Sequence, residues 1–524
     1  MESSPALLGP KGLIKRIEFV RVIIQCLYSL GFRKSASCLE LESGVSEKSV
    51  ELELLESRAM NGDWDGCVDT INVILSEFRD ETRGSVLFLV FKQCLLEYLN
   101  GGDDSLALAM LRKQVPVLRA SRDKVHSLAY SILNSKEMEL PKIDDDVILE
   151  LRRKLLTQLE KLLPPPIVLP ERRLEHLVET AVTAQIDSCL YHNSRDEVSL
   201  YEDHCCGRYQ IPTETIQILT EHKNEVWYVQ FSTTGEYLAS SSCDCTAIIW
   251  QVLEDGKLTL KHTLRSHQNP VSFVAWSPDD TMLLTCGNAE VMKLWDVETG
   301  TCKHTFGDHG FIVSSCAWFP DSKRLVCGSS DPEKGIYMWD CDGNEIKAWR
   351  GRRMPKVLDL AVTPDGEILI TVFSEKEILI LNVMTNAERV ISEEHPITSL
   401  SVSVDSKCFI VNLNSQEIHL WDVAGKWEKP LKYMGHKQHK YVIRSCFGGL
   451  NSKFIASGSE NAQVYIWNRQ NSMPIEVLSG HSTTVNCVSW NPKRPQMLAS
   501  ASDDNTIRIW GSSRSKMMEP GKLV

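Results

Sequence analysis

One short pattern recurs through the second half of the chain and limits its fold more than any other feature. An apolar run ends in tryptophan at six places, and Leu381 in ILILN takes the tryptophan position in a seventh unit. The successive spacings are 45, 44, 42, 40, 46 and 43 residues, the period of a four-stranded propeller blade. The pattern predicts seven blades, with tryptophans at Trp250, Trp295, Trp339, Trp421, Trp467 and Trp510.

A histidine precedes most of these positions by 26 to 31 residues, and these histidines are His222, His267, His309, His395, His436 and His481. A Gly-His pair is present at residues 435–436 and 480–481, and Trp-Asp follows at 295, 339 and 421. The unit therefore resembles the WD-repeat family, in which these two dipeptides bracket each blade.

The resemblance implies a buried hydrogen-bond chain in which aspartate, histidine, a strand hydroxyl and the tryptophan indole pair in sequence. A histidine beside an aspartate and a serine could also indicate a hydrolase triad. Because the group recurs around a ring and a nucleophile is needed once, we interpret it as structural and expect no enzyme activity. Ala289 and Ser415 replace the aspartate in two blades, and Glu375 stands in the blade that lacks tryptophan. The complete sets are His222, Ser240, Asp244 and Trp250 in the first blade and His481, Ser500, Asp504 and Trp510 in the last.

The end of the repeat region lacks one strand. LASAS and TIRIW form the last two strands, and a polar tail follows at 512–524. The segment TETIQILTEH matches the final strand of a blade, although no full blade precedes it. We predict that Ile216 and Ile218 in this segment pair with the strand of Trp510, so that an N-terminal strand closes a propeller over 213–511.

The N-terminal part has helical periodicity. Residues 14–45 carry apolar side chains on two short helices that stop at Gly31 and Gly44, and they resemble the LisH motif, with its corner at Leu30, Gly31 and Phe32. Two helices of this size bury too little apolar surface to be stable alone, so we predict dimerisation. Packing onto the following helices alone is the alternative. The predicted oligomerisation residues are Val20, Ile23, Ile24, Leu27, Phe32 and Leu39.

Residues 46–106 resemble the CTLH motif, with an Asn-Gly-Asp-Trp turn at 61–64, where Asp63 is expected to cap a helix. Further helices of this bundle are expected over 107–163. Their last apolar stripe fits a core or a partner surface, and consists of Ile148, Leu151, Leu155, Leu159 and Leu162. PPPIVLP then predicts a stiff linker, and with the next helix it fills 164–212. We expect that helix to pack on a neighbouring helix or on the propeller flank.

Composition narrows the class of partner. A net charge of −12 argues against nucleic-acid binding, and the absence of a signal pattern or a long apolar run argues against membrane insertion. We expect a cytoplasmic and nuclear protein with reduced cysteines. The densest group of potential metal ligands is His204, Cys205 and Cys206, with Cys243 and Cys245 further on. Because adjacent cysteines rarely face one ion, we expect no metal and no cofactor.

LisH, CTLH and a seven-bladed propeller in this order resemble the WD-repeat subunits of the GID/CTLH E3 ubiquitin ligase. The resemblance implies a noncatalytic scaffold or substrate-presenting subunit that self-associates and joins sister LisH-CTLH scaffold and RING-bearing subunits. The sequence has no RING cysteine pattern, so ubiquitin transfer would belong to another chain. A transcriptional corepressor of the Topless kind and a general signalling scaffold unconnected to ubiquitin are the alternatives.

Two basic loops are candidate partner-binding sites on the propeller. WRGRRMPKV and HKQHKYVIR each gather cationic side chains between blades, where loop tips vary and ligands bind. We hypothesise that they receive an acidic peptide or an acidic partner surface, while solvated loops in an acidic protein are the alternative. The residues are Arg350, Arg352, Arg353 and Lys356 in the first loop and Lys437, Lys440 and Arg444 in the second.

Overall fold

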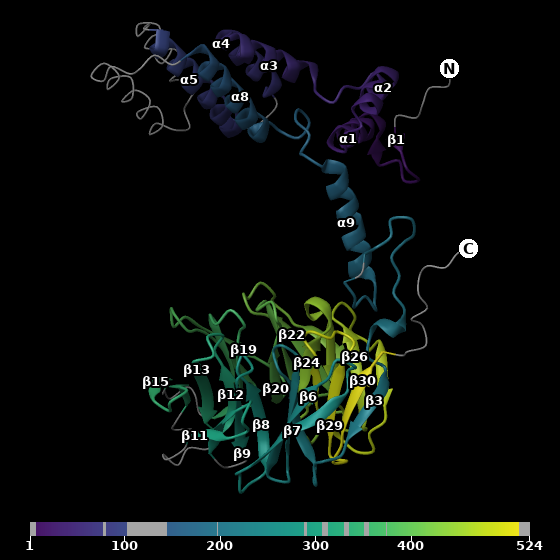
Figure 1. Ribbon diagram of the computed structural model, residues 1–524, viewed down its shortest axis with the longest axis vertical. Coiled ribbons are helices and arrows are strands. Elements are labelled where there is room, and N and C mark those ends of the chain that lie inside the picture. Colours follow the sequence, from purple (N-terminus) through teal and green to yellow (C-terminus); the bar gives the residue numbers. More distant parts are fainter. Residues whose placement is uncertain are drawn as a thin grey trace. The chain divides into compact units, whose positions relative to one another are not determined.

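The chain forms two compact units, residues 1–183 and 184–524, which are described separately (Figure 1). No helix in the described ranges is long and apolar enough to cross a membrane. The computed structural model describes residues 7–76, 80–101, 144–195, 197–287, 291–306, 313–329, 335–349, 356–373 and 375–512.

The first unit begins with a small hairpin of β1 (Leu7–Leu8) and β2 (Ile14–Lys15), followed by α1 (Arg16–Ser29) and α2 (Arg33–Ser43). Gly44 ends α2 with φ of +69°, a left-handed conformation that favours glycine. The two helices predicted on either side of Gly31 are confirmed.

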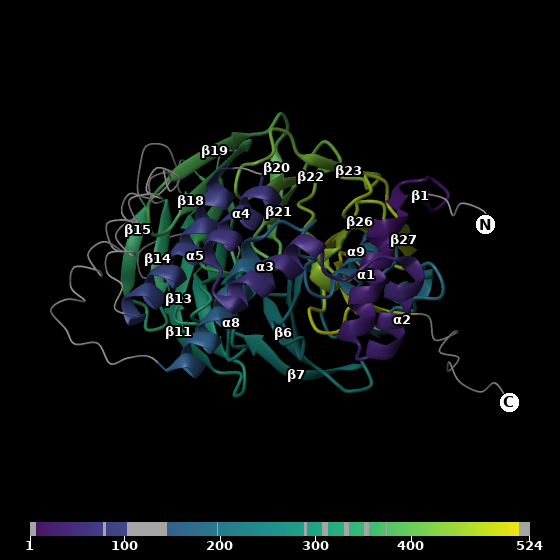
Figure 2. The ribbon, with the colours of Figure 1, turned by 90° about the horizontal axis from the view of Figure 1, so that it is seen from above.

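Four further helices share one apolar core (Figures 1 and 2). Asp63 caps α4 by accepting a hydrogen bond from the Gly66 N–H at 3.0 Å, as predicted. Leu155 and Leu159 are buried in the core, so their stripe packs inside this bundle. Residues 102–143, which include most of the further helices predicted over 107–163, lie outside the described ranges. The helices are α3 (Val50–Asn61), α4 (Trp64–Ile74), α5 (Asp80–Gly101) and α8 (Asp145–Leu162).

An ion pair holds α8 to α5. The Arg152 guanidinium donates two hydrogen bonds to the Glu97 carboxylate, at 2.9 and 2.7 Å, and lies 5.7 Å from the Trp64 ring centre. The Trp64 indole donates to the same carboxylate at 3.2 Å. Three elements of the bundle therefore meet at one acidic side chain.

The proline-rich segment predicted as a stiff linker is fastened along its length. Arg21 of α1 donates to the carbonyls of Pro166 and Ile167 at 2.7 and 2.8 Å, and Gln25 donates to that of Pro170 at 2.9 Å. A segment without regular backbone pairing leaves its carbonyls open, and α1 side chains satisfy them here. The segment therefore packs against the LisH helices and is not a free spacer.

Helix α9 (Arg173–Ser188) follows, and none of its residues is buried. Its final turn contacts the propeller, where Lys453 donates to the Ile186 carbonyl.

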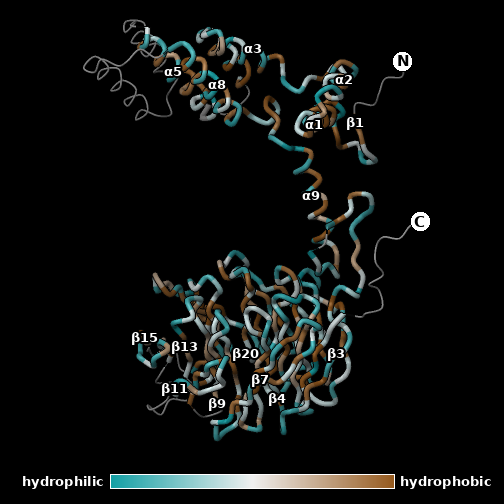
Figure 3. The backbone as a smooth tube through the Cα atoms, in the orientation of Figure 1, coloured by the Kyte–Doolittle hydropathy of each residue, from teal (hydrophilic) through white to brown (hydrophobic). Residues whose placement is uncertain are grey.

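The second unit contains seven four-stranded antiparallel sheets, which we call blades 1 to 7. The first strands of neighbouring blades contact one another around the ring, including β28 with β4. The loops at both ends of the sheets are mostly hydrophilic (Figure 3).

The strands of blades 1 to 3 are β4 (Val226–Phe231), β5 (Tyr237–Ser242), β6 (Thr246–Val252), β7 (Leu258–Arg265); β8 (Val271–Trp276), β9 (Met282–Gly287), β10 (Met292–Asp296), β11 (Cys302–Phe306); and β12 (Val313–Trp318), β13 (Arg324–Ser329), β14 (Ile336–Asp340), β15 (Glu345–Trp349). Those of blades 4 and 5 are β16 (Val357–Val362), β17 (Ile368–Phe373), β18 (Glu377–Asn382), β19 (Glu388–Ser392); and β20 (Ile397–Val402), β21 (Cys408–Leu413), β22 (Glu417–Asp422), β23 (Leu431–Met434). Those of blades 6 and 7 are β24 (Ser445–Gly448), β25 (Phe454–Ser457), β26 (Gln463–Asn468), β27 (Glu476–Ser479); and β28 (Val485–Trp490), β29 (Leu498–Ser502), β30 (Ile507–Gly511) with β3 (Glu214–Leu219).

The ring closes as predicted, because β3 pairs antiparallel with β30. Thr215 lies opposite Trp510 and Ile218 opposite Arg508, and a register shift falls between Thr215 and Gln217. Leu219 enters the core, while Ile216 and Ile218 are about half exposed on the outer side. Blade 7 is thus completed with strands from both ends of the repeat region, and β30 is paired on both of its sides.

Candidate interaction surfaces

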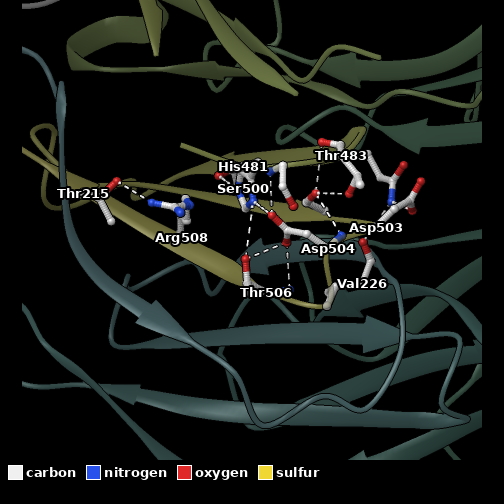
Figure 4. A network of polar contacts seen from close by, with 12 residues as sticks. Thr215, Val226, His481, Thr483, Ser500, Asp503, Asp504, Thr506 and Arg508 are labelled. Carbon is white, nitrogen blue, oxygen red and sulfur yellow. Dashed lines mark hydrogen bonds and ion pairs between the residues drawn. The ribbon is translucent and has the colours of Figure 1, made fainter. Parts of the chain in front are cut away.

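The hydrogen-bond sets of blades 1 and 7 are complete. In blade 7, His481 pairs with Ser500 Oγ at 2.8 Å and with Asp504 Oδ2 at 2.9 Å (Figure 4). The Trp510 indole donates to Ser500 Oγ at 2.8 Å. In blade 1, the same three contacts measure 2.8, 3.0 and 3.0 Å and involve His222, Ser240, Asp244 and Trp250.

The hydrogen-bond sets of blades 1 and 7 have a structural role. Burial opposes the charged form of Asp504, but hydrogen bonds from His481 and Thr506 outweigh that cost and lower its pKa. Ser500 is fully buried, and its hydroxyl is already shared between a histidine and an indole. The hydroxyl is therefore held away from any substrate.

Other blades hold their tryptophan differently. In blade 2, Thr285 replaces the serine and contacts both His267 and Trp295, at 2.7 and 2.8 Å. In blade 6, the Trp467 indole donates to the Met434 carbonyl at 3.0 Å, and His436 contacts Gln438 at 3.4 Å. Ala289 lies outside the described ranges.

The choice of His395 for blade 5 is wrong, since that histidine is exposed. Buried Glu393 takes its place, accepting from the Trp421 indole at 2.7 Å and pairing with His419 at 2.8 Å. Glu393 precedes Trp421 by 28 residues, the same distance that separates His222 from Trp250. Choosing the residue by this spacing, and not by its being histidine, would have identified Glu393.

Arg444 does not belong to an exposed basic loop, which corrects the sequence-based assignment. Its guanidinium pairs with Asp359 Oδ2 at 3.0 Å and lies 5.2 and 4.9 Å from the ring centres of Tyr228 and Phe273. Asp359 also accepts from the Ser315 hydroxyl at 2.7 Å. Because these residues come from blades 1, 2, 3, 4 and the start of blade 6, Arg444 ties first strands together.

Three of the predicted basic residues lie at the surface. Lys356, Lys437 and Lys440 are exposed. The backbone around Lys440 is held by Glu460, whose Oε1 accepts from the N–H groups of His439, Lys440 and Tyr441 at 2.7 to 3.0 Å. This places an acidic group beneath the second loop. Arg350, Arg352 and Arg353 lie outside the described ranges.

The loops divide the propeller into two faces. Lys356, Lys437 and Lys440 lie in loops that join the last strand of one blade to the first strand of the next, so they share one face, which we call the lysine face. The loops between first and second strands open on the opposite face. On that opposite face, residues 189–212, which we call the strap, contact blades 6 and 7, for example through Asn193 and Pro495.

The predicted LisH stripe divides between interior and surface. Ile24 is fully buried and Phe32 is exposed, while Val20, Ile23, Leu27 and Leu39 are half-buried. Ile24 therefore belongs to the interior of the helix pair. The apolar side chains that reach the surface of the hairpin and the two helices are Leu7, Leu13, Ile14, Ile17, Phe19, Leu30, Phe32 and Leu41.

Comparison with known proteins identifies both parts of the chain. The WDR26 Lis-homology domain model matches residues 5–49. The WD domain, G-beta repeat model matches five segments, which are 213–251, 258–296, 300–340, 428–468 and 472–511. The two blades between the third and fourth segments include the one in which Leu381 replaces tryptophan.

Similar proteins align over nearly the whole chain. A WD repeat-containing protein WDS homolog from Arabidopsis thaliana is 69% identical over 97% of this chain and 98% of its own length. A WD repeat-containing protein 26 homolog from the same plant is 45% identical, covering 99% and 88%. GID complex subunit 7 of Schizosaccharomyces pombe is 34% identical, covering 95% and 97%. The chain belongs to the family of WD repeat-containing protein 26 and GID complex subunit 7, and is a WD-repeat scaffold of that kind.

Proposed function

We propose that this chain is a noncatalytic subunit of a GID-type ubiquitin ligase, which self-associates through its LisH helices and holds other proteins on the lysine face of its propeller. Its family membership supports the type of complex, because the fission yeast relative is named as a GID complex subunit. The buried hydroxyls of Ser240 and Ser500 support the noncatalytic role. RING-bearing and sister LisH-CTLH subunits would supply ubiquitin transfer and complete the scaffold.

The observation that carries the self-association part of this proposal is the exposed apolar surface of the LisH helices. Leu41 of α2 is 88% exposed and Ile17 of α1 is 67% exposed, although the two helices are too small to bury a full core. A second copy of the same surface is the partner we infer, because dimers with two-fold symmetry bury one patch against itself.

A charge placed on this surface tests the inference. We expect Ile17→Asp with Leu41→Asp to reduce the mass measured by light scattering, because each carboxylate would be buried in the contact between copies. Val73→Asp is the control, since Val73 of α4 is 68% exposed and lies outside the LisH helices. An unchanged mass in the double variant would reject self-association through this surface. Ile24→Asp is a poorer probe, because Ile24 lies inside the helix pair.

A comparison of two variants with the same change in charge tests whether the lysine face binds partners. We expect Lys356→Glu, Lys437→Glu and Lys440→Glu together to reduce the recovery of partner proteins, because an acidic partner would lose three attractive contacts. The control is Lys323→Glu, Lys407→Glu and Lys493→Glu, which changes charge equally on the opposite face. Equal recovery from both triple variants, measured by quantitative mass spectrometry, would reject this face as the acidic-partner site.

The ligase assignment is tested by co-purification and reconstitution. The tagged chain should recover RING-bearing subunits, and the purified chain should form no ubiquitin conjugates with activating and conjugating enzymes alone. Conjugate formation without a RING subunit would reject the noncatalytic role, and recovery of histone deacetylases in place of ligase subunits would favour a corepressor. We also propose a cytoplasmic and nuclear location, which imaging of the tagged chain tests.

A further inference from the structure

Four potential metal ligands converge within the strap and at the end of α9. The His192 Nδ1 and His204 Nε2 atoms lie 3.0 Å apart, and Cys206 Sγ lies 3.2 Å from His204 Nε2 and 3.5 Å from His192 Nδ1. The ligand atoms of Cys189, His204 and Cys206 all lie within 4.8 Å of one another. Cys189, His204 and Cys206 thus form one group, and His192 lies against its His204 and Cys206 members.

The separations among the ligand atoms of His192, His204 and Cys206 are close to those in a tetrahedral zinc site. Zn–N distances of about 2.0–2.1 Å and Zn–S distances of about 2.3 Å separate ligand atoms by about 3.3 Å for two nitrogens, about 3.6 Å for nitrogen and sulfur, and about 3.8 Å for two sulfurs. The measured nitrogen–nitrogen and nitrogen–sulfur distances differ from these values by a few tenths of an ångström. A group with two cysteines and two histidines suits zinc better than calcium or magnesium, which prefer oxygen.

The surroundings support the same assignment. Cys189 and Cys206 are buried, and the Cys206 backbone N–H donates to Cys189 Sγ at 3.3 Å. An N–H directed at sulfur favours the thiolate that binds a metal. The two imidazole rings meet nearly edge to face, with an interplanar angle of 77°. Each ring can therefore direct one nitrogen to the same point.

We propose that Cys189, His192, His204 and Cys206 bind one Zn²⁺ ion in a closed structural site. Four protein ligands leave no open position for a substrate, so the ion would have a structural and not a catalytic role. It would join the residue that follows α9 to the residues that precede the short helix η1 (Arg208–Gln210). Metal binding would thus contribute to the folding free energy of the strap.

The strap is the segment that needs such a cross-link. It contacts the propeller at separate points, where Asn193 donates to the Pro495 carbonyl at 2.6 Å and Asn468 donates to the Leu190 carbonyl at 3.0 Å. Residues 193–203 are mostly polar and have no regular secondary structure where they are described. The ion would hold the two ends of this loop together, and so fix how the last turn of α9 meets blades 6 and 7.

This proposal departs from the expectation of no metal, which was based on sequence alone. That expectation rested on the adjacent cysteines, but Cys205 is exposed and only Cys206 joins the cluster. Cys245 contacts the Gln268 carbonyl and belongs to a turn of blade 1. Cys189 and His192 complete the set from the residues that directly follow α9.

Metal analysis of the full chain is the direct test. After expression with added zinc, we expect one equivalent of zinc per chain in the wild type and in Cys205→Ser, the matched control. His204→Ala with Cys206→Ser should lose that zinc. A wild type without stoichiometric zinc, or a double variant that retains it, would overturn the proposal.

Cobalt substitution tests the site without relying on a variant that must fold. The wild-type chain loaded with Co²⁺ should show the visible bands of tetrahedral cobalt and a charge-transfer band from two thiolates. A weak octahedral spectrum, or a disulfide between Cys189 and Cys206 in peptide mapping, would overturn the proposal. Removal of zinc by a chelator should accelerate proteolysis within 189–212, and unchanged cleavage would reject the fastening role.

Discussion

Blades 5 and 7 use different residues to accept a hydrogen bond from a buried tryptophan. Each holds a buried tryptophan whose indole N–H needs an acceptor, which is Ser500 Oγ in blade 7 and the Glu393 carboxylate in blade 5. In blade 7 a histidine links that acceptor to Asp504, whereas in blade 5 His419 binds Glu393 directly. The buried indole N–H therefore needs a hydrogen-bond acceptor inside the blade, and either a hydroxyl or a carboxylate can supply it.

A second kind of contact joins blades to one another. Arg444 and Asp359 form a buried pair across the first strands, and Asp359 also accepts from the Leu400 backbone N–H at 3.0 Å. Contacts inside a blade stabilise one sheet, whereas this pair links several. The comparison predicts an order of effects, each measured as the change in the propeller's unfolding free energy. Tryptophan fluorescence suits that measurement, because every tryptophan except Trp64 lies in the second unit.

The largest effect is expected from Arg444→Met. Removing the guanidinium leaves the Asp359 carboxylate buried at 2% exposure, and loss of one partner from a buried ion pair costs about 3–5 kcal/mol. Arg444→Met with Asp359→Leu should recover part of that loss. Denaturant titration of the two variants checks this, and a change below about 1 kcal/mol for the single variant would show that the pair does not tie the ring together.

Glu393→Ala in blade 5 should cost about 3 kcal/mol, because it leaves the Trp421 indole and one nitrogen of His419 without their acceptor. Glu394→Ala is the matched control, since its side chain is exposed and the cost should stay within about 0.5 kcal/mol. Equal denaturation midpoints for the two variants would contradict the role given to Glu393.

Ser500→Ala in blade 7 should cost about 2 kcal/mol, because Trp510 loses its acceptor and His481 loses its partner. Ser500→Thr should cost less, because Thr285 makes the same two contacts in blade 2. If threonine were as destabilising as alanine in thermal or chemical unfolding, the blades would differ in packing and not only in hydrogen bonding.

The smallest effect concerns pH and blade 6. Burial lowers the pKa of His436 from 6.5 to about 4, although one hydrogen bond to Gln438 opposes the shift. Because the folded pKa is depressed, the unfolded chain binds the proton first as pH falls below 6.5, and the folded state loses stability from there down to pH 4. Between pH 7 and pH 5.5 the loss is about 1 kcal/mol.

His436→Leu removes this titration and leaves the rest of the pH dependence in place. The stability difference between pH 7 and pH 5.5 should therefore be smaller in the variant than in the wild type. Identical pH dependence, measured by urea unfolding at both values, would show that the pKa of His436 does not differ between the folded and unfolded states.

Sequence reasoning identified the repeat, the number of blades and the strand that closes the ring, because those features depend on spacing along the chain. It also identified the sets around Trp250 and Trp510 as structural. It placed Arg444 in a surface loop, because a run of basic residues looks the same whether or not one member turns inward. It chose His395 for blade 5 by residue type, whereas spacing favoured Glu393.

By itself, the sequence determined the architecture of this protein, since a period near 43 residues and apolar helical stripes are local properties of the chain. Tertiary structure decided which polar residues meet. Arg444 is 85 residues from Asp359, and Cys189 and Cys206 reach one point only after the strap folds back on itself. The physical reason is that pairing of buried charges and ligands depends on distance in space, which residue order does not specify.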